Sequence, residues 1–175
     1  AAGGNFNLAL NGSNTSVTNA VTLANTGNVA LGNASGDALS FAAGLTRVAG
    51  STTLAGAVTT GTGAISLAAT TLGADSSITT TNQDIGMTSI VGNNYDLSLK
   101  SGTNTTTVSG TVSGVDTLTV GADNSSGAYN FTGNLSSNSL VSPAGTYTVS
   151  LTGSSVAVNN PISFLSSGLV TLGDG

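Results

Sequence analysis

The sequence predicts an all-β fold, and within that class a parallel β-helix of about eight coils. Pairs of apolar residues separated by one polar residue recur along the chain, as in Leu118-Thr119-Val120, and this period of two places the apolar members on one face of a strand. Clusters of Gly, Asn, Ser and Asp, which favour turns, separate the pairs. Equivalent apolar residues recur about 21 residues apart, which is typical of a solenoid.

The interval near 21 residues is the basis of the coil count. It separates Leu10 from Leu31 (21), Leu99 from Val120 (21), Phe131 from Leu151 (20) and Leu151 from Leu172 (21). Phe41, Leu67 and Leu99 do not follow it, because they lie 26 and 32 residues apart. Eight coils of this length, stacked at a strand spacing of about 4.8 Å, would form a rod roughly 40 Å long.

The composition agrees with a β structure and excludes several functions. Charged residues make up 5% of the chain and there is no Glu, whereas Ser, Thr and Asn together number 71 (25 + 28 + 18). Strong helix formers are therefore scarce and strand and turn formers abundant. The net charge of −5, with only Lys100 and Arg47 as cations, gives no basic patch for nucleic acid. Neither a run of 18 apolar residues nor a Cys is present.

The sequence of the N-terminal half predicts short strands that are separated by frequent turns. Its apolar alternation falls at Phe6/Leu8/Leu10, Val21/Leu23, Val29/Leu31 and Leu39/Phe41. The turns at 11–14, 25–28 and 32–37 contain Gly or Asn, which tolerate a positive φ. From about residue 48 to 85 the apolar residues stand mostly alone among Thr, Ala and Gly, so we expect shorter strands there.

Alternation is clearest in the C-terminal half. It includes Leu97/Leu99, Leu118/Val120, Tyr129/Phe131, Leu140/Val141, Tyr147 to Leu151, Val156/Val158, Ile162/Phe164 and Leu169 to Leu172, with Pro143 and Pro161 in turn-like contexts. We predict that Leu118, Val120, Tyr129, Phe131, Val149 and Leu151 point into the core. Ser98, Thr119 and Ser150 are then expected to face solvent.

An antiparallel β-sandwich is the alternative architecture. Sandwich strands usually run five or six residues and often bury large aromatic residues. Here the alternating runs are three to five residues long, aromatic residues are 4% and Trp is absent. The β-helix, with residues 1–175 as one solenoid domain and an excerpt or processed part of a longer repeat protein, is therefore the preferred interpretation.

Two segments resemble the repeat regions of filamentous-haemagglutinin-like and autotransporter-like bacterial surface proteins. They are TTLAGAVTTGTGAISLAATTLGADSSITTTNQDI, from Thr52 to Ile85, and TTTVSGTVSGVDTLTVGAD, from Thr105 to Asp123. The resemblance implies a right-handed parallel β-helix displayed outside the cell as an adhesin, stalk or fibre. The only Asn-Pro, at Asn160, is followed by Ile162 and not by the Asn-Gly expected of the family's secretion domain.

Catalytic and metal sites are not expected. The sequence has no His, Cys or Glu, so the commonest bases, nucleophiles and nitrogen ligands are missing. The carboxylate pairs Asp75/Asp84 and Asp116/Asp123 are explained by turn chemistry. The segments around Asp123 and Asp174 have a faint likeness to calcium-binding repeats, but the acidic residues are too sparse for a ligand set. We therefore expect no enzyme activity, no cofactor and no metal.

The sequence favours a structural or adhesive role at a bacterial cell surface. No polar cap covers either end of the coil stack, which has Phe6, Leu8 and Leu10 at one end and Leu169 to Leu172 at the other. The expected partners are therefore further coils or copies of the chain stacked end to end. One alternative is a pilus-like subunit that donates the strand Asn5 to Asn11. Another is an ice- or carbohydrate-surface binder that uses outward rows such as Thr117/Thr119 and Thr146/Thr148.

Overall fold

The computed structural model describes residues 3–121 and 125–173, which form eighteen strands in one continuous sheet. The strands are β1 (Leu8–Leu10), β2 (Thr15–Val17), β3 (Val21–Leu23), β4 (Val29–Leu31), β5 (Ala38–Phe41), β6 (Leu45–Arg47), β7 (Ser51–Thr60), β8 (Ile65–Thr80), β9 (Ile85–Val91), β10 (Leu97–Lys100), β11 (Thr105–Val108), β12 (Val112–Val120), β13 (Ala128–Phe131), β14 (Leu135–Gly145), β15 (Thr148–Leu151), β16 (Val156–Val158), β17 (Ser163–Ser166) and β18 (Val170–Leu172). Within these ranges no helical segment has the length and apolarity needed to cross a membrane.

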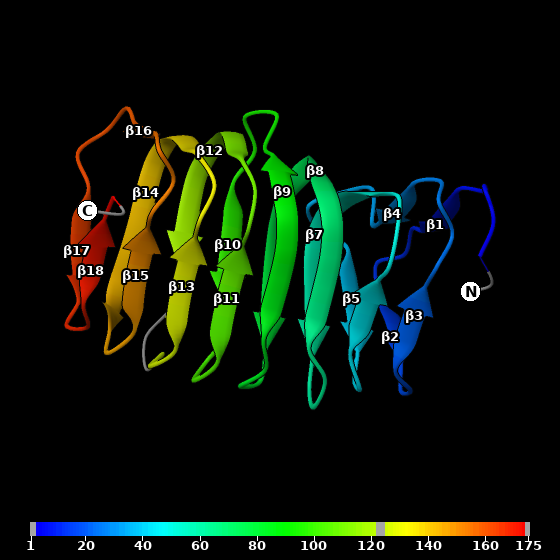
Figure 1. Cartoon of the computed structure of the whole chain (residues 1–175). Coiled ribbons are helices and arrows are strands. Elements are labelled where there is room, and N and C mark those ends of the chain that lie inside the picture. The colour runs from blue at the N-terminus through cyan, green and yellow to red at the C-terminus, as the bar shows by residue number, and fades with distance from the viewer. Residues whose placement is uncertain (1–2, 122–124, 174–175) are drawn as a thin grey trace.

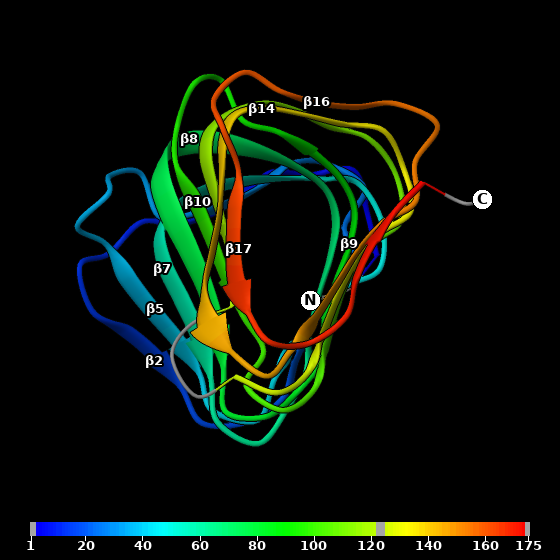
Figure 2. The ribbon, with the colours of Figure 1, turned by 90° about the vertical axis from the view of Figure 1, so that its left-hand side faces the viewer.

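The strands wind around one axis and build three faces (Figure 1, Figure 2). Face A contains β1, β4, β7, β8, β9, β12, β14 and β16 in stacking order. Face B contains β2, β5, β7, β8, β10, β12, β14 and β17, and face C contains β3, β6, β8, β9, β11, β13, β15 and β18. The long strands contribute to more than one face, so each face has eight segments and the chain makes eight coils.

Every described strand pairing is parallel, so the predicted β-solenoid of about eight coils is confirmed and the antiparallel sandwich is wrong. The four predicted intervals are register pairs: Leu10 with Leu31, Leu99 with Val120, Phe131 with Leu151 and Leu151 with Leu172. The residues that did not fit belong to different faces. Phe41 pairs with Val17 on face B, whereas Leu67 pairs with Met87 on face C.

The core is a set of inward columns that run along the axis. Leu118, Val120, Tyr129, Phe131, Val149 and Leu151 are all buried, as predicted. Ser98, Thr119 and Ser150 lie between them on the outer side and are partly exposed, because neighbouring coils cover their flanks. Burial of each Leu or Phe contributes about 1.5–3 kcal/mol, so the stacked columns are the main stabilising feature.

The expectation of shorter strands between residues 48 and 85 is wrong. β7 and β8, with 10 and 16 residues, include the longest strand of the chain. Pairing continues around the corners here, because small residues let the backbone bend without leaving the ladder. At Gly56, which has a φ of 85° and sits at a register shift, a Cβ would lie 2.4 Å from the carbonyl oxygen of Asp37. Only glycine fits that corner.

Asn and Asp side chains join successive coils at the corners, where the strand ladder is interrupted. Asp75 Oδ1 accepts a hydrogen bond from the backbone N–H of Asp96 (3.0 Å), and Asp96 Oδ1 accepts one from that of Thr117 (2.9 Å). On the corner between faces C and A, Asn134 Oδ1 accepts from the N–H of Ser155 (3.1 Å). The abundance of these residues thus has a structural cause, since they satisfy backbone groups of the next coil.

Candidate functional site

Of the two carboxylate pairs that the sequence offered as possible catalytic pairs, Asp75 and Asp84 lie on different corners, and Asp123 of the second pair lies outside the described residues. Asp75 lies on the corner between faces A and B, and Asp84 on the corner between faces B and C. Asp84 Oδ1 accepts hydrogen bonds from the N–H of Thr105 (3.0 Å) and the amide of Asn104 (3.3 Å). Asp116 lies on the same corner as Asp75 and accepts from the Nδ2 of Asn138 (2.8 Å). Each of the three therefore connects one coil to the next.

Asp123 and Asp174, the two residues considered for calcium, lie outside the described residues. Among residues 3–121 and 125–173, no three acidic side chains gather closely enough to hold a metal ion. The stacked carboxylates of Asp75, Asp96 and Asp116 already accept hydrogen bonds from neighbouring coils.

We predict that chelator treatment leaves the thermal unfolding curve of the chain unchanged. The corner carboxylates are satisfied by protein donors, so the fold does not need a cation to neutralise them. Unfolding followed by circular dichroism with EDTA, and again with excess calcium, checks this expectation. A clear drop in the midpoint with EDTA would instead point to a calcium site that includes Asp123 or Asp174.

Ser and Thr follow the outer side of face B in columns. One column contains Ser16, Ser40, Thr59, Thr79 and Lys100; the next contains Ala57, Ser77, Ser98, Thr119, Val141 and Ser163. Thr117, Thr119, Thr146 and Thr148 lie on the outer side as predicted. Thr-x-Thr is not repeated from coil to coil, however, because Ser and Lys interrupt the first column and Ala, Ser and Val interrupt the second. The regular hydroxyl lattice required of an ice-binding face is missing from face B.

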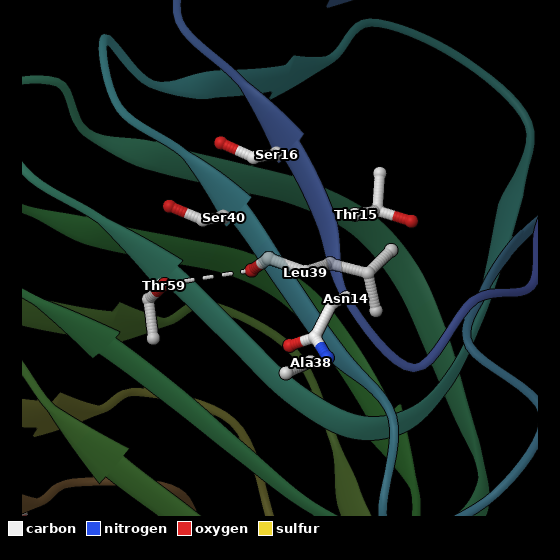
Figure 3. Close-up of a pocket in the computed structure, with 7 residues that line it drawn as sticks. All are labelled: Asn14, Thr15, Ser16, Ala38, Leu39, Ser40 and Thr59. Atoms are coloured by element: carbon white, nitrogen blue, oxygen red, sulfur yellow. Dashed lines mark hydrogen bonds between the residues drawn. The ribbon is translucent and has the colours of Figure 1, made fainter.

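A small depression of about 160 Å³ lies at the N-terminal end of these columns (Figure 3). Ser16, Ser40 and Thr59 come from β2, β5 and β7, and Asn14 borders them. The Thr59 hydroxyl donates to the carbonyl oxygen of Leu39 (3.5 Å), so part of the polar lining is used within the sheet. Charged and aromatic side chains are missing from the lining, which leaves little to orient a ligand.

The C-terminal end of the solenoid opens into an apolar cavity of about 470 Å³. It is lined mainly by Leu151, Val156, Val158, Ile162 and Leu172. Leu151 ends β15 in the seventh coil, whereas the other four belong to the eighth coil. Leu172, at the rim, is 64% exposed. The cavity is therefore the end of the core columns, at the free edge of β16, β17 and β18.

The N-terminal end presents the opposite edge of the same columns. Leu8 and Leu10 are half-buried against β4, and Phe6 is 42% exposed. Because β1 pairs in parallel with β4 of its own chain, the segment proposed as a donated pilus strand is already part of the first coil. The edge of β1 that does not face β4 is the N-terminal edge of the solenoid itself.

Charged side chains are missing from the described residues of both end coils. Residues 3–36 and 125–173 contain no Asp, Glu, Lys or Arg, whereas Asp37, Arg47, Asp75, Asp84, Asp96, Lys100, Asp116 and Asp123 lie between them. Natural β proteins commonly place charged or proline residues at exposed sheet edges to prevent edge-to-edge pairing. Neither described end has a charged residue of this kind. The two ends are the surfaces best suited to interaction with other sheets.

The sequence indicated the apolar ends, but not the cavity. Phe6, Leu169 and Leu172 were recognisable as uncapped, whereas Ile162 was assigned to a strand that in fact begins at Ser163. Its position in the connection between β16 and β17, at the cavity mouth, depends on how that corner folds.

Comparison with protein families, with curated proteins and with solved structures finds no match to this chain.

Proposed function

We propose that the chain is a structural β-solenoid, a rod-like segment of a stalk, fibre or adhesin displayed outside a bacterial cell. The observation that carries the proposal is the parallel strand pairing that joins eight successive coils on each of three faces. The resemblance to filamentous-haemagglutinin-like and autotransporter-like repeats supports the extracellular and adhesive parts. A rod of this kind works by its length and shape.

The use of side chains supports a structural role over an enzymatic one. The corner residues Asp75, Asp84 and Asp96 bind neighbouring coils, and the inward columns are mostly aliphatic. Since His, Cys and Glu are missing from the sequence, few groups are left for acid–base or nucleophilic chemistry. We therefore expect the protein to have no catalytic activity.

In this proposal the isolated 175-residue chain also stacks end to end. The free edge of the eighth coil and that of the first coil each expose strand hydrogen-bonding groups and apolar side chains, among them Leu169 (71% exposed) and Phe6. Contact between unlike ends is heterologous and does not close, so it produces filaments. In a longer chain, flanking coils would pair with the same edges.

We predict that Leu172→Asp shortens or abolishes the filaments of the isolated chain. The change places an unpaired carboxylate at the rim of the apolar cavity, where stacking would bury it at a cost of several kcal/mol. Because Leu172 is largely exposed in the single chain, the variant should still fold. Light scattering over a concentration series, together with electron microscopy, measures the length of the assemblies.

The matched control is Val91→Asp, which adds the same charge on the outer side of face A in the fifth coil. This variant should form filaments as the unmodified chain does. Unmodified chains that stay monomeric at high concentration, with no rods longer than one molecule, would contradict end-to-end stacking.

A further inference from the structure

We infer the register of the stacked copies: β16, β17 and β18 of one copy pair with β1, β2 and β3 of the next, in parallel. In this register Val156 lies beside Leu8, Ala157 beside Ala9 and Thr171 beside Thr22 of the next copy. The inference rests on the proposed stacking and specifies its geometry. The partner that covers the C-terminal cavity is then the N-terminal face of a second copy of this chain.

The columns inside the chain determine which strands should meet. On face C, one outer column runs through Thr22 and Thr46, and Thr171 ends the same column seven coils along. On face A, Leu8 begins the inward column that Val156 ends. A second copy placed in this register continues each column with a residue of the same orientation. The new interface then repeats the contact between neighbouring coils.

Rotation of the second copy about the axis would break this continuity. The outline of the solenoid seen along its axis is elongated, and its three sides are unequal (Figure 2). Placing face A over face B or C would therefore leave strand edges without partners at the junction. Unpaired backbone groups buried in this way cost about 1–3 kcal/mol each. Only the unrotated arrangement pairs all three free edges.

The apolar surfaces are complementary in the same register. Leu8 and Leu10, which are half-buried at one end, would lie over Val156 and Val158, which line the cavity at the other. Leu23 would lie over Leu172 at the rim. The cavity is large enough for several aliphatic side chains, and filling it removes their apolar surface from water. Among residues 3–121 and 125–173, neither end coil has a charged side chain that would oppose the contact.

Cysteine cross-linking tests the register, since the chain has no cysteine of its own. Two single variants, Ala9→Cys and Ala157→Cys, place thiols on exposed outer positions of the first and eighth coils. Across the proposed junction the two Cα atoms would be about 4.8 Å apart, within the range of a disulfide. Within one chain they are seven coils apart, about 34 Å, so an intramolecular bond is excluded.

Mixing the two variants under mild oxidation should give a disulfide-linked heterodimer on non-reducing gels. The matched control mixes Ala9→Cys with Thr171→Cys, whose thiols are on faces A and C of the eight-coil rod. We expect at least tenfold more heterodimer from the 9–157 mixture than from the 9–171 mixture. Peptide mapping of the linked product identifies the two cysteines.

The outcomes separate the register from the stacking. Filaments in which the 9–171 mixture links as well as the 9–157 mixture would overturn the register but leave stacking intact. Homodimers of Ala9→Cys in place of heterodimers would show head-to-head contact and would also overturn it. If the unmodified chain forms no assemblies at all, both the stacking and its register are wrong.

Discussion

Leu118→Asp is expected to unfold at least the sixth coil and its two neighbours. Leu118 is fully buried on face B, where its column continues through Leu97 on one side and Leu140 on the other. A carboxylate at this position is surrounded by aliphatic side chains. Loss of the leucine and burial of an unpaired charge together cost about 5 kcal/mol or more. For a chain of this size, this corresponds to a fall in melting temperature of roughly 10–20 °C.

The matched control is the adjacent residue. Thr119→Asp changes the net charge by the same amount, but its side chain lies on the outer side beside Ser98 and Val141. We expect its stability to change by no more than about 0.5 kcal/mol. Hydrogen exchange adds spatial detail, because each coil of a solenoid contacts only its neighbours and protection should be lost around β12 first. Equal melting temperatures for the two variants would contradict the inward and outward assignments.

The coil count and much of the register could be predicted because large apolar residues occupy equivalent columns. Where this holds, as for Phe131, Leu151 and Leu172 on face C, the 20- and 21-residue intervals give the true pairs. The prediction failed in the middle of the chain because the inward positions there are not all apolar. Thr52 and Thr70, for example, are buried in the column that begins at Leu8. Inward threonines hide the period of two, so long strands were interpreted as short ones.

The end surfaces could be predicted only in part. Uncapped apolar residues are visible in the sequence, because alternation simply continues to Leu172. The cavity depends on the path of the corner that carries Ile162, one of its lining residues, and alternation along the strands does not specify that path. The sequence also gave no sign that Arg47 would be buried, since an isolated charge in a polar chain is normally found at the surface.

Arg47 is the second position at which a large effect is expected, because its guanidinium holds the corner between faces C and A. It is 4% exposed. Nη1 donates to the carbonyl oxygens of Leu23 (3.2 Å) and Asn25 (2.6 Å) and to Asn25 Oδ1 (3.0 Å), and Nη2 donates to the carbonyl oxygens of Gly27 and Ser51. Its hydrogen bonds therefore join the turn before β4 to the start of β7.

The surroundings fit the two terminal nitrogens of the guanidinium closely, whereas its Nε is buried without a hydrogen-bond partner. Gly50 has a φ of 78°, and a Cβ there would lie 2.3 Å from Nη2 of Arg47. Asn25, which is fully buried, donates from Nδ2 to the carbonyl oxygen of Phe6 (2.8 Å) while its Oδ1 accepts from Arg47. Burial lowers the pKa of Arg47, but an arginine pKa starts so high that the group stays charged at neutral pH. Carbonyl oxygens thus take the place of a carboxylate partner.

Arg47→Met is expected to destabilise the first three coils by about 3 kcal/mol or more. Methionine has a similar length and fills the space, but it removes the Arg47 donors from the carbonyl oxygen and Oδ1 of Asn25 and from the carbonyl oxygen of Gly27. Each buried acceptor that loses its donor costs about 1–3 kcal/mol, whereas the carbonyl oxygen of Leu23 keeps the backbone N–H of Val48. Arg47→Lys should have an intermediate effect, because it keeps the charge but loses the forked geometry that reaches both sides of the corner. Chemical denaturation gives the free energy of unfolding, and hydrogen exchange in β1 to β7 locates the loss.

Lys100→Met is the control that separates this corner from a general effect of charge. It lowers the net charge by the same unit and introduces the same side chain, but Lys100 lies on the outer side of face B beside Thr79. Its stability should change by no more than about 0.5 kcal/mol. If Arg47→Met and Lys100→Met lost similar amounts of stability, the hydrogen bonds of Arg47 would not be what holds the corner. A large loss for Arg47→Met alone, partly restored by Arg47→Lys, would show that a buried cation bound by carbonyl oxygens stabilises the N-terminal coils.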